Sequence, residues 1–459
     1  MNLTLKDLEK LRSVEIVHGE DLRGKKINGI STDSRSMKTG NLFFALRGEK
    51  FDGHEFVQEV IAKGASAIVV DSGWSKNAPD VIPRLQPCVV IVPDTTKALG
   101  ELALLYRRKF SIPIIAVGGS NGKTTTKEMI SAVLRTKYSV LSTEGNLNNH
   151  IGVPQTMFRL SPNDDIAVLE LGTNHFGELK RLCAIVEPTH ALITNIGKEH
   201  LEFFGDEEGV AKEETELFRS VRRKGFAFIN ADDEHLRKSG KKIARSLTYG
   251  LSTKAKLRAT NVTINNAGQP TFDVSTKSSK KKSTVQLSVS GAHNISNALA
   301  ATAVGIKFKV PPKKILQALH RWRAAKKRME INSRNGVTII NDTYNANPDS
   351  TIAALKTLQS LKVPGKKIVV LADMLELGEK AEHEHAKIGL AVSDLEFEYL
   401  LTFGPLSRFT HEASKLPFAE HFDLKEALIV SLKSQVSAGD AVLVKGSRGM
   451  KMEDIVEQL

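Results

Sequence analysis

Short apolar runs alternate along most of the chain with longer stretches in which apolar and polar residues recur at helical spacing. Each apolar run predicts a buried strand, and each amphipathic stretch predicts a helix. Regular alternation of the two favours an α/β protein with mainly parallel sheets. The main strands are expected at residues 67–70, 114–116, 166–172, 190–196, 337–342, 367–373, 399–404 and 441–446.

The chain of 459 residues is too long for one hydrophobic core, and we expect three domains. Residues 1–110 are predicted to form a small α/β domain. Residues 111–320 are predicted to form a doubly wound mononucleotide-binding domain, and residues 321–459 a second doubly wound, Rossmann-like domain. The third segment has no glycine fingerprint of its own, so it need not bind a dinucleotide.

A glycine-containing loop lies between the expected strand at 114–116 and a helical pattern at 127–134. Glycines allow successive backbone N–H groups to face a phosphate chain, and the helix N-terminus adds positive potential. The spacing is a shortened phosphate-loop motif, and the alternative is an ordinary turn at the start of a helix. We interpret it as an ATP site made of Gly119, Ser120, Asn121, Gly122, Lys123, Thr124 and Thr125.

Composition limits the class of protein. Hydrophobic residues make up 41% and charged residues 25% of the chain, which is typical of a globular protein. No run of 18 apolar residues is present, so no membrane insertion is expected. Cys88 and Cys183 lie in apolar settings without metal-ligand spacing, and together with a mixed, charged N-terminus they favour a cytoplasmic location.

The formal net charge is +13, and we interpret the lysines as dispersed along the sequence. The one dense run, residues 277–282, contains no interleaved aromatic residues and separates two alternating segments, 271–274 and 284–289. This arrangement predicts a solvated hairpin tip rather than a nucleic-acid site. We expect no nucleic-acid partner, because an anionic small substrate explains a positive balance equally well.

Two of the expected strands are followed by residues suited to a metal site. Glu170 ends the strand at 166–172, and His200 follows the strand at 190–196. Carboxyl ends of parallel strands lie at one sheet edge, where ligands bind. Oxygen ligands from Glu170 and Thr124 suit Mg²⁺, and His200 would serve a second metal position. The alternative is that both are surface residues just beyond strand ends.

Taken together, these polar clusters resemble the signatures of the Mur ligases. The resemblance covers residues 30–459 and rests on residues 119–125, Glu170 with 172–175, 194–197 with His200, 291–298 and 342–348. Further stretches favour the member that adds D-alanyl-D-alanine, namely residues 33–35, 51–54, 344–348, 371–378 and 444–450. The Asp-Asn-Pro-Arg type of motif usual in the ligase that adds the third residue is not found.

The resemblance implies an ATP-dependent amide ligase of peptidoglycan precursor synthesis. ATP would phosphorylate the terminal carboxylate of UDP-N-acetylmuramoyl-tripeptide, and the amine of D-Ala-D-Ala would attack the acyl phosphate. Such a transfer needs charge neutralisation and positioning more than a protein nucleophile. ATP and Mg²⁺ are the expected cofactors, and a monomer is the expected active unit. The third residue of the tripeptide, lysine or diaminopimelate, stays open.

The same resemblance assigns residues to the ligands. Lys123, Glu170 and His200 would form the catalytic group, to which we add Glu214 by the hypothesis given below, and Thr124 would be a further metal ligand. Asn294 and Asn297 would lie at the adenine and nucleotide, Asp342 at the ribose and Arg328 at the phosphates. The two substrates would contact a larger set, which comprises Asp33, Ser34, Arg35 and Arg47 for the UDP-sugar, Asn345, Asn347 and Arg448 for the dipeptide, and Asn174, His175 and Tyr344.

One position departs from the family pattern. The family usually presents a carbamylated lysine whose carbamate helps to hold the second metal. Counting back from Leu217-Phe218, Glu214 occupies that place, and Lys212 lies two residues earlier. A separation of two residues corresponds to about 200° of rotation on a helix, so Lys212 and Glu214 cannot both face the metals. We hypothesise that Glu214 supplies the carboxylate directly, and the alternative is that Lys212 is modified.

Two other interpretations are kept. Another Mur-type or folylpolyglutamate-type ligase would differ in the acceptor and amine that release phosphate from ATP. A nucleotide-gated binding module without catalysis would use Lys123 as a switch.

Overall fold

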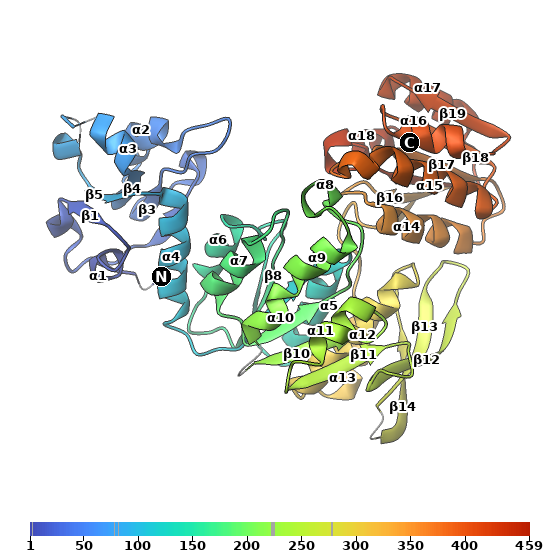
Figure 1. Cartoon of the computed structure of the whole chain (residues 1–459), viewed down its shortest axis with the longest axis horizontal. Coiled ribbons are helices and arrows are strands. Elements are labelled where there is room, and N and C mark those ends of the chain that lie inside the picture. The colour runs from blue at the N-terminus through green and yellow to red at the C-terminus, as the bar shows by residue number, and fades with distance from the viewer. Residues whose placement is uncertain (2, 78, 81, 222–224, 277–278) are drawn as a thin grey trace. The chain divides into compact units, whose positions relative to one another are not determined.

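The computed structural model describes all residues except 2, 78, 81, 222–224 and 277–278 (Figure 1). The chain divides into two compact units, each built from segments distant in sequence. The first contains residues 1–116, 138–172 and 178–189, and the second contains residues 117–137, 173–177 and 190–459.

The first unit contains a five-stranded sheet in the order β1-β5-β4-β3-β2. Strands β2 to β5 are parallel, and β1 pairs with β5 antiparallel. The central strands β4 and β5 are nearly continuous apolar runs and are buried on both faces. Two further parallel strands, β7 and β8, also belong to this unit. The elements are α1 (Leu5–Leu8), β1 (Glu15–Val17), β2 (Gly29–Ser31), β3 (Asn41–Phe44), α2 (Val57–Ala62), β4 (Ala67–Asp71), α3 (Ser72–Asn77), β5 (Cys88–Val92), α4 (Thr95–Arg107), β7 (Val140–Ser142), α6 (Gly152–Met157), β8 (Ile166–Glu170) and α7 (Glu178–Val186).

Strand β6 (Ile114–Gly118) leads into the second unit, where helix α5 (Lys123–Arg135) follows the glycine loop. Strands β9 to β12 are parallel, whereas β12, β13 and β14 are antiparallel, which confirms the expected hairpin. Its tip at 277–278 lies outside the described residues. The elements are β9 (His190–Ile193), α8 (Leu201–Phe204), α9 (Glu207–Glu214), α10 (Glu216–Val221), β10 (Phe226–Asn230), α11 (Glu234–Gly240), β11 (Ser246–Gly250), β12 (Leu257–Ile264), β13 (Pro270–Thr276), β14 (Ser279–Gln286), α12 (His293–Lys307) and α13 (Pro312–Arg321).

The last part of the second unit holds a six-stranded sheet in the order β15-β16-β20-β17-β18-β19. All pairs are parallel except β15 with β16. Ile368 and Val370 of β17 point into one core and Val369 and Leu371 into another, so helices cover both faces, as the sequence predicts. The elements are β15 (Glu330–Arg334), β16 (Val337–Asp342), α14 (Pro348–Ser360), β17 (Lys367–Ala372), α15 (Ala381–Asp394), β18 (Tyr399–Phe403), α16 (Ser407–Ala413), β19 (Phe418–Phe422), α17 (Lys425–Gln435), β20 (Ala441–Lys445) and α18 (Glu453–Gln458).

Strand β9 is shorter than the apolar pattern predicts, because it ends at Ile193 and not at residue 196. The next two residues bind the glycine loop instead of continuing a strand. Thr194 N–H donates to the Gly118 carbonyl at 3.0 Å, and the Asn195 carbonyl accepts from Ser120 N–H at 2.9 Å. Polar residues at a strand end therefore hold the loop in place.

Cys88 and Cys183 are buried free thiols, as expected. Within the described residues, no helix is both long and apolar enough to cross a membrane.

Candidate active site

The phosphate loop, residues 119–125, has a backbone that glycine alone adopts without strain. Gly119 and Gly122 have φ values of +109° and +78°. A Cβ on Gly119 would lie 2.3 Å from Thr194 Oγ1, and one on Gly122 would lie 2.8 Å from Asn297 Oδ1. Gly122 is the N-cap of α5 and provides no capping side chain, so the first-turn N–H groups are directed toward an anion site.

Lys123, the first residue of α5, directs its ammonium group back over the loop. Nζ donates to the Gly119 carbonyl at 2.5 Å and to the Ser120 carbonyl at 3.3 Å. It also pairs with Glu199 Oε2 at 3.0 Å, and the Glu199 side chain is 6% exposed. Sequence reasoning selected His200 and missed this carboxylate, although Glu199 lies beside it after the same strand.

Glu214, at the end of α9, is fully buried and lies against the phosphate loop. Its Oε2 accepts the Gly119 N–H at 2.7 Å. Burial, followed by repulsion from Glu199, raises the pKa of Glu214 to about 8, although Lys123 opposes this. Lys212 is exposed, with Nζ 5.2 Å from the centroid of the Phe176 ring. Helix α9 thus presents Glu214 and not Lys212 to the loop.

His200 adopts φ +48° and is held by a carboxylate from a distant part of the second unit. Its Nδ1 lies 2.5 Å from Glu376 Oε2, and this hydrogen bond lowers the pKa of Glu376. Its Nε2 lies 4.0 Å from Glu199 Oε2. A histidine oriented by a carboxylate at one ring nitrogen keeps the other nitrogen available for a metal or substrate.

The carboxylates at the loop have the donor chemistry of a cation site. Among the described residues, one buried oxygen of Glu199 and one of Glu214 have no hydrogen-bond partner. Such oxygens are unfavourable unless a cation or proton satisfies them. No group of three or more His, Cys, Asp or Glu side chains in the described part of the chain is already arranged around a metal position. The oxygens fit a hard cation such as Mg²⁺.

Two asparagines of α12 support the other side of the loop. Asn297 Oδ1 accepts from the Thr126 hydroxyl at 3.0 Å, and its Nδ2 donates to Asn294 Oδ1 at 3.0 Å. Asn294 in turn donates to the Ser290 carbonyl at 2.8 Å. The side chains of Thr126, Asn294 and Asn297 are all buried, so this hydrogen-bond network fixes α12 against α5.

The segment after β16 reaches the phosphate loop. Asn347 caps α14 by accepting from Ser350 N–H, and its Nδ2 donates to Asn121 Oδ1 at 2.9 Å. Asp349 accepts the Lys198 N–H at 2.8 Å. The expected dipeptide residue Asn347 therefore lies beside the expected ATP loop.

Asp342, Arg328, Tyr344 and Arg448 lie in the same part of the second unit. Asp342 accepts from Lys445 Nζ at 2.5 Å and from Met329 N–H at 3.0 Å. The Arg328 guanidinium stacks over the Tyr344 ring at 3.6 Å, and the Arg448 guanidinium lies 5.9 Å from that ring. These contacts form a cationic and aromatic surface. Asn345 is exposed, and its carbonyl accepts from Lys445.

The remaining expected residues fall into two groups. In the second unit, Asn174 and His175 are exposed, and the His175 ring lies 4.2 Å from that of Phe203. The first unit holds Glu170, Ser34, Asp33, Arg35 and Arg47.

Within the first unit, Glu170 accepts from Asn148 at 2.9 Å and has one buried oxygen without a partner among the described residues. Arg35 binds Asp33 at 2.7 Å, and this contact lowers the pKa of Asp33 to about 2. Arg47 pairs with Asp71 at 2.8 Å.

A phosphate loop that opens a helix, with a half-buried lysine and partnerless carboxylate oxygens around it, defines a nucleotide-using α/β enzyme with phosphoryl-transfer chemistry. Comparison with known protein families gives the particular class. The Mur ligase family catalytic domain matches residues 26–107, the Mur ligase middle domain matches residues 117–305, and the Mur ligase glutamate ligase domain matches residues 327–448. The chain belongs to the Mur ligase family, and it is an ATP-dependent ligase.

Relatives match over nearly the whole length. The UDP-N-acetylmuramoyl-tripeptide–D-alanyl-D-alanine ligase of Bacillus subtilis is 37% identical over 94% of this chain and 93% of its own. The Escherichia coli enzyme of that name is 36% identical over 97% and 96%. A crystal structure of MurF from Acinetobacter baumannii superposes with a TM-score of 0.91 at 29% identity, covering 100% of this chain and 99% of that one. MurF from Thermotoga maritima, solved with ADP, gives 0.82 at 27% identity, covering 94% and 97%.

Proposed function

We propose that this chain joins D-alanyl-D-alanine to UDP-N-acetylmuramoyl-tripeptide, as a monomer in the cytoplasm. ATP phosphorylates the terminal carboxylate of the tripeptide, the dipeptide amine attacks the acyl phosphate, and ADP and phosphate leave. The observation that supports this proposal most strongly is the group of Lys123, Glu199 and Glu214 at the phosphate loop. The chain that holds this group matches ligases of this name over nearly its whole length.

Lys123 and the loop amides provide the positive potential for the phosphates. The Lys123 side chain is 16% exposed, and its ammonium group donates to backbone carbonyls of the phosphate loop. Its charge would stabilise the oxygens that gain charge during transfer. The Asn297 and Thr126 contact keeps α5 in position while the nucleotide binds.

Mg²⁺ is the cation that these oxygen donors suit. Glu199 and Glu214 would hold it in the second unit, together with Thr124 and His200. Glu170 of the first unit is the remaining carboxylate expected as a metal ligand. When bound, the ion neutralises phosphate charge and orients the transferred group. Glu214 supplies a carboxylate where relatives use a carbamylated lysine, so this ligand does not depend on CO₂.

The substrates occupy the outer parts of the site. Asp33, Ser34, Arg35 and Arg47 would bind the UDP-sugar. The Arg328 and Tyr344 stack would lie at the nucleotide phosphates, with Asp342 at the ribose. Asn345, Asn347 and Arg448 would seat the dipeptide, and the bond from Asn347 to Asn121 couples that seat to the phosphate loop.

A phosphate-release assay tests this function. The full chain receives ATP, Mg²⁺ and D-Ala-D-Ala with UDP-tripeptide carrying either lysine or diaminopimelate at position three. We expect release with one or both acceptors, a product of the mass of the pentapeptide, and no release by Lys123→Ala.

The alternatives give different results. Release only with a folate or another amino acid would assign another ligase of this superfamily. Nucleotide binding without release with either acceptor would overturn the specific proposal and favour a binding module.

A further inference from the structure

The positive charge of this protein is concentrated in one stretch, contrary to the dispersed arrangement expected from the sequence. Residues 235–329 contain 21 Lys and Arg residues and a single acidic residue, Asp273. The rest of the chain contains 44 basic and 51 acidic residues, so it is slightly negative. The Asp273 carboxylate accepts from Asn261 and Thr284 at 2.8 Å, so its bonds are directed within the hairpin.

Helix α13 presents part of this charge to solvent. Ile315 and Leu319 are buried against the protein, whereas Lys313, Lys314 and Arg321 are exposed. The apolar side of the helix is therefore already used in folding, and only its basic side is available to a partner.

Neighbouring elements extend this basic side. Lys314 Nζ donates to the Thr136 carbonyl at the end of α5 at 2.9 Å. Lys137 Nζ donates to the Lys309 carbonyl at the end of α12 at 2.9 Å. These bonds bring three elements together in one surface, which we call the α13 face. It consists of Lys137, Lys309, Lys313, Lys314, Arg321, Trp322 and Arg323.

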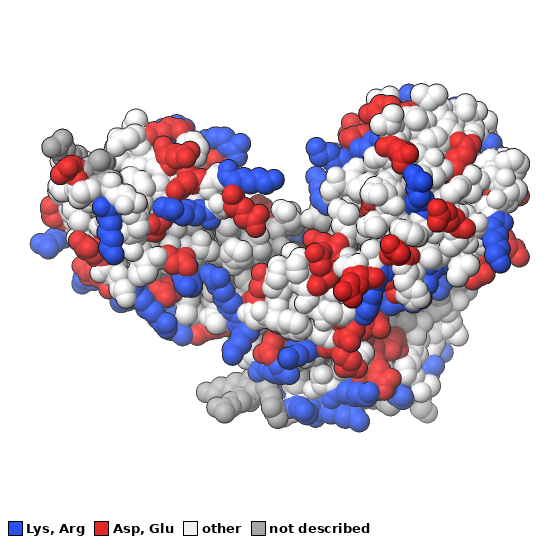
Figure 2. Space-filling view, turned by 45° about the horizontal axis from the view of Figure 1, so that its top comes forward, with Lys and Arg blue, Asp and Glu red and all other residues white. Residues whose placement is uncertain are grey.

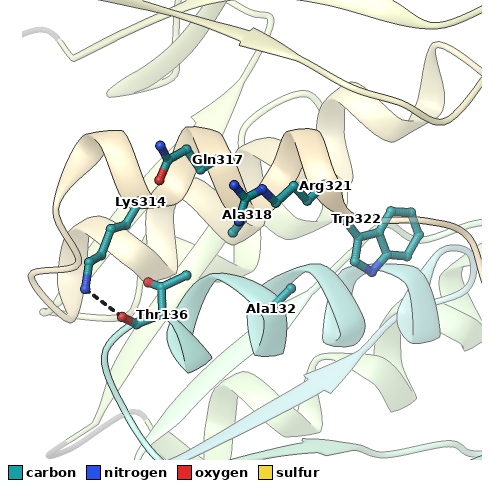
Figure 3. Close-up of a pocket in the computed structure, with 7 residues that line it drawn as sticks. All are labelled: Ala132, Thr136, Lys314, Gln317, Ala318, Arg321 and Trp322. Atoms are coloured by element: carbon teal, nitrogen blue, oxygen red, sulfur yellow. Dashed lines mark hydrogen bonds between the residues drawn. The ribbon is translucent and has the colours of Figure 1, made fainter.

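A shallow hollow lies in this face between α13 and α5 (Figure 3). Lys314, Gln317, Ala318 and Arg321 of α13 line it opposite Ala132 and Thr136 of α5, and Trp322 lies at one end. Trp322 is half-buried beside these cations. On the face shown in Figure 2, Lys, Arg, Asp and Glu side chains are mixed over most of the surface, and Lys and Arg side chains gather along the lower edge beside a few Asp and Glu side chains.

We propose that the α13 face binds reversibly to the surface of an anionic lipid membrane. Lys and Arg attract acidic headgroups, and a tryptophan at the edge of such a patch suits the boundary between headgroup and acyl chain. Because Ile315 and Leu319 are buried, binding is adsorption and not insertion of the helix.

Nucleic acid fits this surface less well. Stacking platforms need exposed aromatic rings along a groove. Of the aromatic residues in 235–329, Tyr249 and Phe272 are 1% exposed and so unable to stack with bases. Trp322 is a single ring at the end of a helix, which suits a lipid interface better than a run of bases.

Vesicle sedimentation of the full chain tests the proposal. We expect binding to vesicles of phosphatidylglycerol mixed with phosphatidylcholine, weakening at high salt, and no binding to pure phosphatidylcholine. Lys313→Glu combined with Arg321→Glu should lower the partition coefficient by on the order of 30-fold. Lys25→Glu combined with Lys26→Glu, an equal charge change at exposed sites of the first unit, should lower it by only a few-fold.

Fluorescence locates the contact. The chain has two tryptophans, so Trp74→Phe leaves Trp322 as the reporter. Its emission should move to shorter wavelength with anionic vesicles. An unchanged unfolding temperature of the charge variants shows that they fold, whether or not the chain is active as a ligase.

Three results would overturn the proposal. These are absence of binding to anionic vesicles at physiological salt, equal losses in the two double variants, and an unchanged Trp322 spectrum in bound protein. Duplex DNA binding that the α13 variant alone loses, without vesicle binding, would assign the face to nucleic acid instead.

Discussion

Glu214 is the residue whose replacement tests the site most directly. Its carboxylate is fully buried, accepts the Gly119 N–H at 2.7 Å and faces Glu199 near Lys123. Glu214→Gln keeps an oxygen that accepts the N–H but removes the negative charge. Glu214→Ala removes both, so the pair separates a structural role from an electrostatic one.

The structure gives the expected magnitudes. In Glu214→Ala the buried Gly119 N–H has no acceptor, which costs about 1–3 kcal/mol relative to Glu214→Gln. For a chain of this length, that difference corresponds to an unfolding temperature about 1–3 °C lower. If the carboxylate holds Mg²⁺, both variants lose about 10²- to 10³-fold in turnover, as is usual when one charged partner of the transferred group is removed.

Three measurements check these values. Differential scanning calorimetry compares the two variants without ligands, phosphate release at saturating substrates gives turnover, and a Mg²⁺ titration of turnover gives the apparent metal affinity. We expect Glu214→Gln to be stable but nearly inactive, with a raised Mg²⁺ requirement. Turnover of the natural chain should not respond to removal of bicarbonate.

Full activity of Glu214→Ala would refute the assignment. So would a carbamate found on Lys212, or turnover that falls in CO₂-free buffer, because the ligand would then be the modified lysine. Lys212→Ala is the matched control two residues away, and it should keep most of the activity.

Two more predictions concern other buried polar groups. Asn297→Ala leaves the Thr126 hydroxyl and Asn294 without their partner, so we expect the free energy of unfolding to fall by about 1–3 kcal/mol, which calorimetry measures. We also expect a higher KM for ATP, which the phosphate-release assay measures. His385 is buried, accepts the Met374 N–H at 2.9 Å, and has a lowered pKa because burial disfavours its charged form. The unfolded chain takes up a proton on this histidine near pH 6.5, whereas the folded chain takes it up only at lower pH. The free energy of unfolding should therefore fall as the pH drops below 6.5, by at most about 1.4 kcal/mol per pH unit. His385→Gln should show a smaller fall in a thermal unfolding series from pH 7.5 to 5.5, and an equal fall would contradict this reasoning.

Local structure around the phosphate loop follows from the sequence because it depends on near neighbours. An apolar run predicts β6, glycines predict a loop of positive φ, and helical spacing predicts α5. The rotation between Lys212 and Glu214 is a property of any helix, so it could be worked out before the fold was known.

Contacts made after a strand ends do not follow from periodicity. The segment after β9 turns at His200 with φ +48°, which brings Glu199 to Lys123 and His200 to Glu376. Sequence reasoning placed His200 at the site and missed Glu199, since nothing in the pattern shows which side chain a turn directs inward.

The sequence by itself determined the alternation of strands and helices, the phosphate loop and the family, because these depend on short-range spacing. The tertiary structure alone decided which carboxylates surround Lys123 and that Lys137 joins the cations of residues 309–323 on the α13 face. Both arrangements bring together residues far apart in the chain, whose distance is set by packing of the elements and not by their order in the sequence.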